Sequence, residues 1–276
     1  MKAGFIGTGS MGSILIEALI HSGALNPEQI CAANRTPGKV QRLAETYAGL
    51  TAASSNAEAA AGRDVVFLCV KPLDYMEVID EIRPSLEPAQ IVVSITSPVL
   101  LKHLEDQLPC KVTKIIPSIT NYVLSGSTLC IHGERMHPED KEWIENLLTH
   151  ISTPVRVSEA YTRISSDLSS CAPAFLSFFL QKYIETAVKE TGISPEEATI
   201  LASEMTLGTG KLLTTGGFDP VSLQKRVRVP GGITAEGLQL MEQDLDGMFE
   251  RLIGITHAKY EEDLEKVEAV FKTKKQ

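Results

Sequence analysis

Six residues near the start of the chain restrict its fold more than any other feature of the sequence. Residues 7–12 read Gly-Thr-Gly-Ser-Met-Gly and fit the pattern G-x-G-x-x-G. The apolar run Ala3–Gly7 leads into this pattern and predicts a strand. Apolar residues then recur at helical spacing, at Met11, Ile14, Leu15, Ala18 and Leu19. A glycine-rich turn between a strand and an amphipathic helix is typical of the first βα unit of a dinucleotide-binding domain.

Each glycine of this turn has a role that another residue would fill poorly. Gly7 permits the tight turn, Gly9 lets the backbone approach a pyrophosphate, and Gly12 allows the helix to pack close to the strand. The start of the helix adds free N–H groups and a partial positive charge, which attract phosphate. We therefore expect cofactor contacts from Ile6, Gly7, Thr8, Gly9, Ser10, Met11 and Gly12. The alternative interpretation is a tight βα turn that binds no ligand.

The N-terminal half of the chain alternates between short apolar runs and helical patterns. Further strands are predicted at Ile30–Ala33, Asp64–Val70, Ile91–Ile95 and Val112–Ile116, with helices between most of them. Leu129–Ile131 and Val155–Val157 are candidates to extend the same sheet. Strands that alternate with helices imply right-handed βαβ crossovers and a parallel sheet. The predicted fold class is therefore α/β, with an N-terminal Rossmann domain built on a parallel sheet.

Strand patterns stop near residue 159, and the rest of the chain reads as helices. Residues 166–189 form a predicted helix that is apolar nearly all round, so it must be covered on several sides. Later helix starts are marked by a capping residue before a proline, at Ser194 and at Asp219. Two more helices are expected, one from near Thr234 and one over about residues 245–267.

These patterns predict two domains. We expect a Rossmann domain that binds NADP over residues 1–158, followed by an all-α dimerisation and substrate domain over residues 159–276. The helical part is more apolar than so small a unit can cover alone, which predicts a homodimer or a higher homo-oligomer.

Composition narrows the partners and the compartment. The net charge of -9 repels phosphate backbones, so no nucleic-acid partner is expected. No apolar run approaches the roughly 18 residues of a membrane span and no signal segment is visible, which predicts a cytoplasmic protein with no membrane partner. The five cysteines form no C-x-x-C pair, which fits reduced thiols and predicts no metal site. The basic cluster Lys272, Lys274 and Lys275 is interpreted as a solvated tail.

The second strand is followed by residues that favour NADP(H) over NAD(H). An NAD site usually carries an acidic residue there, about 20 residues past the glycines, to bond the ribose 2′-hydroxyl. This chain has Asn34, Arg35 and Thr36 instead, and Arg35, backed by Thr36 and by Lys39, is suited to a 2′-phosphate. The alternative is that Arg35 is a solvated loop residue.

A second candidate site lies in the helical part. Residues 229–234 read Val-Pro-Gly-Gly-Ile-Thr and precede a predicted helix. Two glycines before a helix start form a nest of N–H groups for an anion such as a substrate carboxylate, with the Thr234 hydroxyl at or near the cap. An ordinary interhelical loop with Thr234 as a plain cap is the alternative.

Together these segments resemble the pyrroline-5-carboxylate reductase family over nearly the whole chain. The segments that carry the resemblance are FIGTGSMG at residues 5–12, NRT at 34–36, CVKP at 69–72, LGTGKLL at 207–213 and RVRVPGGIT at 226–234. The resemblance implies NAD(P)H-dependent reduction of a cyclic imino acid, pyrroline-5-carboxylate, to proline. It also implies an interlocked helical dimer whose active site combines the Rossmann part of one subunit with the PGG-x-T loop of the other.

The resemblance further implies roles for particular residues. The cofactor contacts would include Asn56 and the ends of two strands near the nicotinamide, at Cys69, Val70, Lys71, Pro72, Ile95 and Thr96. The substrate contacts would come from Gly231, Gly232, Ile233, Thr234 and Pro173. Thr234 would be the catalytic residue, because its hydroxyl would bond the imine nitrogen and assist its protonation.

Three segments depart from the usual family pattern. Val229 stands where a serine is usual, Ser118 and Ile119 replace the N-T of M-P-N-T-P, and Cys171 falls in a segment that usually reads S-G-S-G-P. The departures are similar to those of the late-competence branch of the family. Two alternatives therefore remain: a catalytically weak, NADP-binding regulatory homologue, and a reductase of another small carboxylate.

Overall fold

The computed structural model describes residues 1–273, so Lys274 and Lys275 of the basic cluster lie outside the described residues. The chain divides into two compact units. One consists of residues 1–173 together with the chain from Thr256 onward, and the other of Ala174–Ile255. This division does not coincide with the expected domain boundary after residue 158, which stays a prediction.

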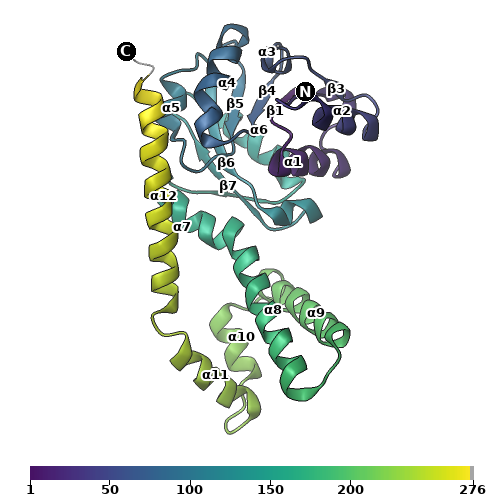
Figure 1. The fold of residues 1–276 in the computed structure, drawn as a ribbon, viewed down its shortest axis with the longest axis vertical. Coiled ribbons are helices and arrows are strands. Elements are labelled where there is room, and N and C mark those ends of the chain that lie inside the picture. Colours follow the sequence, from purple (N-terminus) through teal and green to yellow (C-terminus); the bar gives the residue numbers. More distant parts are fainter. Residues whose placement is uncertain (274–276) are drawn as a thin grey trace. The chain divides into compact units, whose positions relative to one another are not determined.

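The first unit is built on a single sheet (Figure 1). Its strand order is β3-β2-β1-β4-β5-β6-β7-β8, eight strands within residues 1–273. The strands are β1 (Ala3–Ile6), β2 (Ile30–Ala33), β3 (Thr51–Ala52), β4 (Val65–Leu68), β5 (Ile91–Ser94), β6 (Lys111–Ile116), β7 (Ser127–His132) and β8 (Thr153–Arg156). β2 and β3 follow on one side of β1, and β4 and the later strands follow on its other side, so the strand order switches between β1 and β4. In this class of sheet, ligands bind in the crevice at such a switch point.

The parallel sheet that the sequence predicts is confirmed for β1 to β6, and the last two strands run in the opposite direction. β1 to β6 are parallel, but β7 pairs with β6 antiparallel, and β8 pairs with β7 parallel. Only a short connection with a 3-10 turn, η4 (Ile119–Val123), joins β6 to β7, and without a crossover helix the chain has to return antiparallel. The short strand β3 was not predicted, because its two exposed residues carry no apolar run.

Helices cover both faces of the sheet (Figure 1). On one face the core includes side chains from α1 (Ser10–His21), α2 (Pro37–Thr46) and α6 (Pro138–Thr149). On the other it includes side chains from α3 (Asn56–Ala60), α4 (Tyr75–Ile82), α5 (Leu101–Glu105) and the end of α12 (Met248–Thr273). Strand residues therefore alternate between two apolar cores, as a sheet buried on both faces requires.

Short helical turns connect these elements. The 3-10 turns besides η4 are η1 (Pro27–Gln29), η2 (Pro72–Asp74), η3 (Arg83–Ser85) and η5 (Glu159–Tyr161). The predicted long helix is divided into α7 (Thr162–Ser166), a π-helical turn η6 (Asp167–Cys171) and α8 (Ala172–Thr191). Pro173 is the second residue of α8, two residues after the end of the π-helical turn.

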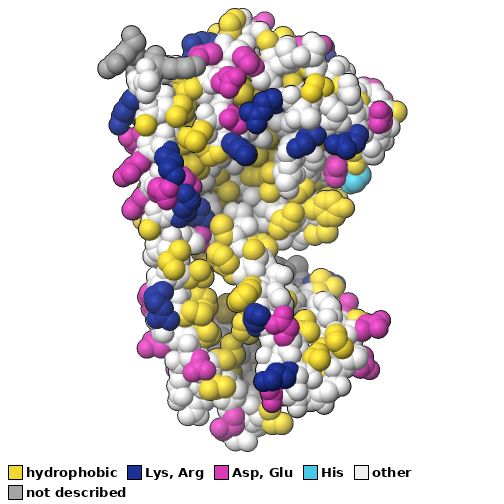
Figure 2. Space-filling view, viewed as in Figure 1, with side chains coloured by type: hydrophobic (Ala, Val, Ile, Leu, Met, Phe, Trp, Pro, Cys, Tyr) yellow, Lys and Arg dark blue, Asp and Glu magenta, His cyan; other side chains and the backbone are white. Residues whose placement is uncertain are grey.

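The second unit is helical, with α9 (Pro195–Thr214), α10 (Pro220–Val227), α11 (Ile233–Asp244) and most of α8. The predicted caps are confirmed: Ser194 accepts a hydrogen bond from the Glu197 backbone N–H, and Asp219 accepts two from the first turn of α10. Among the residues of this unit only Ala198 and Ala235 are buried. Apolar side chains are exposed over its visible face (Figure 2).

No helix within residues 1–273 is long and apolar enough to cross a membrane. Within the same residues, no three or more His, Cys, Asp or Glu side chains are grouped so that they could hold a metal ion. All five cysteines are free thiols.

Candidate cofactor site and substrate loop

The glycine turn between β1 and α1 has the geometry that its three glycines predict. Gly7 has φ +97°, and a Cβ there would lie 2.5 Å from the Cys69 carbonyl oxygen. A Cβ on Gly12 would lie 2.1 Å from the Gly7 carbonyl oxygen, so α1 packs directly on the turn. A Cβ on Gly9 would meet no atom within 4 Å. The turn is therefore closed behind Gly7 and Gly12 and open in front of Gly9, where the backbone can approach a ligand.

The start of α1 suits an anionic ligand. Gly9 is the N-cap of this 12-residue helix, and no side chain caps its first N–H groups. These N–H groups and the helix dipole attract phosphate. Thr8 is only 3% exposed, and its Oγ1 atom has no hydrogen-bond partner among the described residues. The open backbone and the free helix start fit a dinucleotide pyrophosphate, and the buried Thr8 hydroxyl is a further donor beside them.

Asn34, at the end of β2, connects the glycine turn to the start of α2. Its Oδ1 accepts a hydrogen bond from the Thr8 N–H at 2.9 Å, and its Nδ2 donates to the Thr36 carbonyl at 3.1 Å. The side chain that stands where NAD sites carry a carboxylate is therefore engaged in holding two loops together. Asn34 and Thr36 therefore lie close to the predicted residues of the glycine turn.

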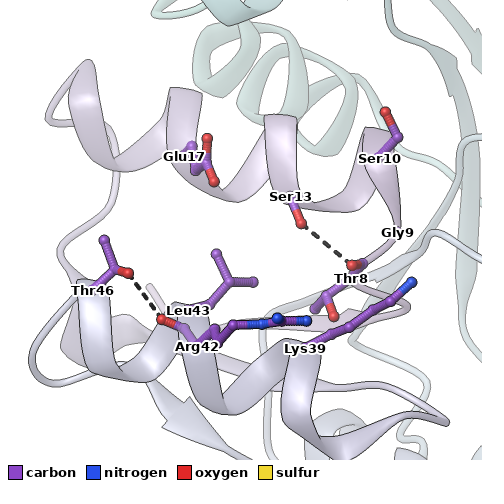
Figure 3. A pocket seen from close by; sticks show the side chains of 9 residues that line it. All are labelled: Thr8, Gly9, Ser10, Ser13, Glu17, Lys39, Arg42, Leu43 and Thr46. Atoms are coloured by element: carbon purple, nitrogen blue, oxygen red, sulfur yellow. Dashed lines mark hydrogen bonds between the residues drawn. The ribbon is translucent and has the colours of Figure 1, made fainter.

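A pocket of about 380 Å³ opens beside the turn, between α1 and α2 (Figure 3). It is lined by Thr8, Gly9, Ser10, Ser13, Glu17, Lys39, Arg42, Leu43 and Thr46. Of the predicted 2′-phosphate residues only Lys39 lines it, whereas Arg35 and Thr36 lie exposed in the preceding turn. Arg42 was missed from the sequence. The signal that could have found it is its spacing of three residues from Lys39, which puts both on one face of a helix.

The ends of β4 and β5, where the nicotinamide was expected, are tied to each other. The Thr96 hydroxyl donates to the Val70 carbonyl at 3.4 Å. Tyr75 is fully buried, and its hydroxyl donates to the Leu68 carbonyl at 3.0 Å and bonds the Ser94 hydroxyl at 2.9 Å. Burial raises the pKa of the Cys69 thiol to about 12, so this group stays neutral against the turn.

Three other predicted cofactor residues flank this region. Lys71 caps η2 and is exposed, and Pro72 is the first residue of that turn. Asn56 begins α3, and its Nδ2 donates to Glu81 of α4 at 2.5 Å. The Asn56 amide is therefore held by a neighbouring carboxylate and can turn toward a ligand only by exchanging that bond.

Two of the residues that depart from the family pattern, Ser118 and Cys171, lie at the π-helical turn. Ser118 is fully buried, and its hydroxyl donates to the Ser169 carbonyl at 3.0 Å. Arg163 donates to the Cys171 sulfur at 3.1 Å and to Asp167 Oδ1 at 2.7 Å. Ser118 is thus engaged within the first unit, while Ile119, next along the chain, is half exposed.

The predicted substrate loop lies in the second unit. Gly231 has φ +71°, and the Gly232 N–H donates to the Val229 carbonyl at 2.9 Å. Gly232 is the N-cap of α11, which begins at Ile233, so Thr234 is the second residue of the helix. The Thr234 side chain is exposed and makes no hydrogen bond to the described residues. The loop therefore presents a helix start and a free hydroxyl, as the sequence predicts.

Taken together, a glycine turn at the switch point of a mostly parallel sheet and a helical second unit define a dinucleotide-binding protein of the Rossmann class. Residues 2–98 match the family described as NADP oxidoreductase coenzyme F420-dependent. Residues 159–263 match the family described as pyrroline-5-carboxylate reductase dimerisation.

Relatives cover nearly the whole chain. It is 41% identical over 271 residues to ComE operon protein 4 of Bacillus subtilis (strain 168), and the aligned region covers 98% of this chain and 99% of that relative. It is 30% identical over 244 residues to the pyrroline-5-carboxylate reductase of Escherichia coli (strain K12), which covers 88% and 90%. The Plasmodium falciparum pyrroline carboxylate reductase with NADP bound has the same fold, with a TM-score of 0.81 at 24% identity over 98% of both chains. The chain belongs to the pyrroline-5-carboxylate reductase family.

Proposed function

We propose that this protein reduces the C=N bond of pyrroline-5-carboxylate, or of a related cyclic imino acid, with NADPH, and that pyrroline-5-carboxylate yields L-proline. The observation that carries the proposal is the open helix start with a free Thr234 hydroxyl at the PGG-x-T loop, in a family member whose glycine turn is intact. The relatives support the reaction type. The glycine turn supports binding of the cofactor, and the PGG-x-T loop supports binding of the substrate.

NADP(H) is the proposed cofactor. The carboxylate that would bond a free ribose 2′-hydroxyl is replaced by Asn34, and Arg35 and Thr36 follow it. Residues 2–98 match the family described as NADP oxidoreductase coenzyme F420-dependent, and a solved structure of the same fold was determined with NADP bound. The proposed contacts are those of the turn at residues 6–12, Asn34 to Thr36, Asn56, and the strand ends at residues 69–72 and 95–96.

The protein's own contribution to the reaction is binding, orientation and a proton. When bound, the cofactor supplies the hydride. The N–H groups of Gly231 and Ile233 and the dipole of α11 bind the substrate carboxylate, while the Gly232 N–H stays bonded to the Val229 carbonyl. The Thr234 hydroxyl donates to the imine nitrogen and helps to deliver its proton, directly or through water, which makes the imine carbon a better hydride acceptor. Pro173, at the start of α8, is proposed as a further substrate contact.

A homodimer is the proposed minimal assembly. Large apolar side chains of the second unit are exposed, among them Phe178 (61%), Tyr183 (63%) and Leu201 (63%). Exposed apolar surface on this scale is typical of an interface. The match of residues 159–263 to a dimerisation family supports a second copy of the chain as the partner.

The test is NADPH oxidation followed at 340 nm with pyrroline-5-carboxylate, alongside NADPH binding on the same preparation. Turnover above the rate without substrate supports the proposal. Tight binding without turnover on this substrate or related cyclic imino acids contradicts it.

A regulatory homologue is the second candidate, and two observations favour it. The chain is 41% identical to ComE operon protein 4, against 30% to the reductase of Escherichia coli. Ser118 stands at a position where the family usually has asparagine, and its hydroxyl donates to the Ser169 carbonyl. A competence-related protein that binds NADPH but turns over weakly would give the second outcome of the same test.

A further inference from the structure

Unpaired positive charge surrounds the first turns of α2. Arg35, Lys39 and Arg42 are all exposed, and within residues 1–273 none of them forms an ion pair. Lys39 and Arg42 extend from α2 along the pocket toward the side where Thr8 lies (Figure 3). The one carboxylate that lines the pocket belongs to Glu17, at the end away from Ser10 (Figure 3). An anion is therefore favoured at the Thr8 end and repelled from the other.

The buried hydroxyl of Thr8 marks the same end of the pocket. The Thr8 backbone is held on both sides, because its N–H donates to Asn34 and its carbonyl accepts from the Ser13 hydroxyl. Thr8 lines the pocket, and its buried Oγ1 has no partner in the described chain. A buried hydroxyl without a partner is costly, and a ligand oxygen at this position would satisfy it.

We propose that this pocket completes the site for the 2′-phosphate of NADP, and that Arg42 is a specificity-determining residue for NADP over NAD. The inference rests on the proposed function for the choice of nucleotide and adds Arg42, which the sequence pattern did not indicate. Arg42 and Lys39 supply the charge, and the Thr8 hydroxyl donates the third hydrogen bond.

The place of the pocket in the fold supports this ligand. In Rossmann domains the adenosine ribose lies at the end of the second strand, and here that end is Asn34, which bonds Thr8 directly. A phosphate monoester carries nearly two negative charges and three acceptor oxygens. Two cations and one hydroxyl match that group, and the guanidinium fork of Arg42 can bond two of its oxygens at once.

The experiment is calorimetric titration of the full-length protein with three nucleotides that differ only in the ribose phosphate: adenosine 2′,5′-bisphosphate, adenosine 3′,5′-bisphosphate and adenosine 5′-monophosphate. The variants are R42A, R35A and T8V. K102A is the charge control, because Lys102 is exposed on α5, across the sheet from α2, and forms no ion pair with the described residues. NADPH and NADH affinities are measured on every protein.

We expect the wild type to prefer the 2′,5′ isomer, and R42A to weaken it about tenfold while the monophosphate and NADH bind as before. T8V should lose part of the preference without loss of thermal stability, since it removes a hydroxyl that has no partner. K102A should bind like the wild type.

The inference is overturned if R42A binds all three nucleotides like the wild type while R35A loses the preference. The phosphate would then lie on the turn before α2 and not in the pocket. Failure of the proposed function gives a different result. If the wild type prefers the 2′,5′ isomer through Arg42 but reduces no imino acid, this inference holds and the proposed reductase activity is contradicted. A wild type that binds NADPH no better than NADH contradicts both the cofactor proposal and this inference.

Discussion

The ammonium of Lys114, a residue of β6, is fully buried and lies 2.7 Å from the Glu159 carboxylate. Its Nζ also donates to the Ser97 carbonyl at 3.3 Å, and the same Glu159 oxygen accepts from the Leu101 N–H at 2.9 Å. Burial lowers the pKa of Lys114, and the carboxylate opposes that shift. This pair ties β6 to the loop after β5, where the nicotinamide end of the cofactor is proposed to lie.

Removal of the carboxylate should cost more than removal of the ammonium. E159Q keeps an oxygen that can accept from Leu101 and Lys114 but removes the negative charge, so the buried ammonium loses its counter-ion. We expect a loss of about 2 kcal/mol in the free energy of unfolding. The estimate is below that for a fully buried pair, since the Glu159 side chain is 31% exposed and water screens part of the interaction. K114M replaces the ammonium by an apolar side chain of similar length, and the expected change is within about 1 kcal/mol.

Urea unfolding of the two variants and the wild type, at one protomer concentration, measures both changes. E159Q as stable as the wild type would mean that the buried ammonium finds other partners. The double variant K114M/E159Q should be close to K114M alone, because the carboxylate has then lost its cation.

The glycines of the turn predict two separable effects. A Cβ at Gly12 meets the Gly7 carbonyl oxygen at 2.1 Å, so G12A must displace α1 and should cost about 1–3 kcal/mol of stability. A Cβ at Gly9 meets nothing, so G9A should cost less than about 1 kcal/mol, which is the range for an N-cap change to alanine. G9A should nevertheless weaken NADPH binding about tenfold or more, because its methyl group lies where the pyrophosphate approaches.

Thermal unfolding and NADPH fluorescence titration of both variants separate the two effects. The role assigned to Gly9 is wrong if G9A binds NADPH with the affinity of the wild type.

The sequence predicted those parts of the fold whose cause is local. The turn at residues 7–12 was predictable because spacing and flanking elements must agree, and the strand predicted at Ile30–Ala33 has the bounds of β2. The direction of β7 was not predictable, because an apolar run such as Leu129–Ile131 has the same pattern in both directions. Only the ten-residue connection, too short for a crossover, decides it.

The candidate site shows the same limit. Asn34 was predicted from its place after β2, but its bond to Thr8 depends on how two loops meet. Arg42 was missed because the pocket exists only when α1 and α2 pack on the same face of the sheet. Lys114 gave no signal either, since one lysine within a strand reads as an exposed residue until its partner 45 positions away is known.

Buried thiols predict how stability changes at alkaline pH. Burial raises the pKa of Cys130 to about 12, well above the value near 9 of an exposed thiol. Between those values the unfolded chain loses a proton that the folded chain keeps, so the free energy of unfolding falls as pH rises, by up to about 1.4 kcal/mol per pH unit for this thiol. The contribution is fully present below about pH 8.5, the ordinary thiol pKa.

C130A removes this titration. Urea unfolding at several pH values should give parallel curves for variant and wild type below about pH 8 and a shallower fall for C130A between about pH 9 and 11. Equal slopes throughout that range would mean that the Cys130 thiolate forms as easily in the fold as in the unfolded chain.

Thr234 is the residue on which the proposed chemistry depends most. Its hydroxyl is exposed at the second position of α11 and has no partner in the described chain, so T234A should leave stability and NADPH affinity unchanged. Loss of the group that assists protonation of the imine should lower kcat about 100-fold or more, the lower end of the range for general acid catalysis. T234S keeps the hydroxyl and should retain most of the turnover. Steady-state kinetics with pyrroline-5-carboxylate at saturating NADPH distinguish these outcomes. A T234A variant with the kcat of the wild type would remove Thr234 from the mechanism and leave the N–H groups of Gly231 and Ile233 as the contribution of this loop.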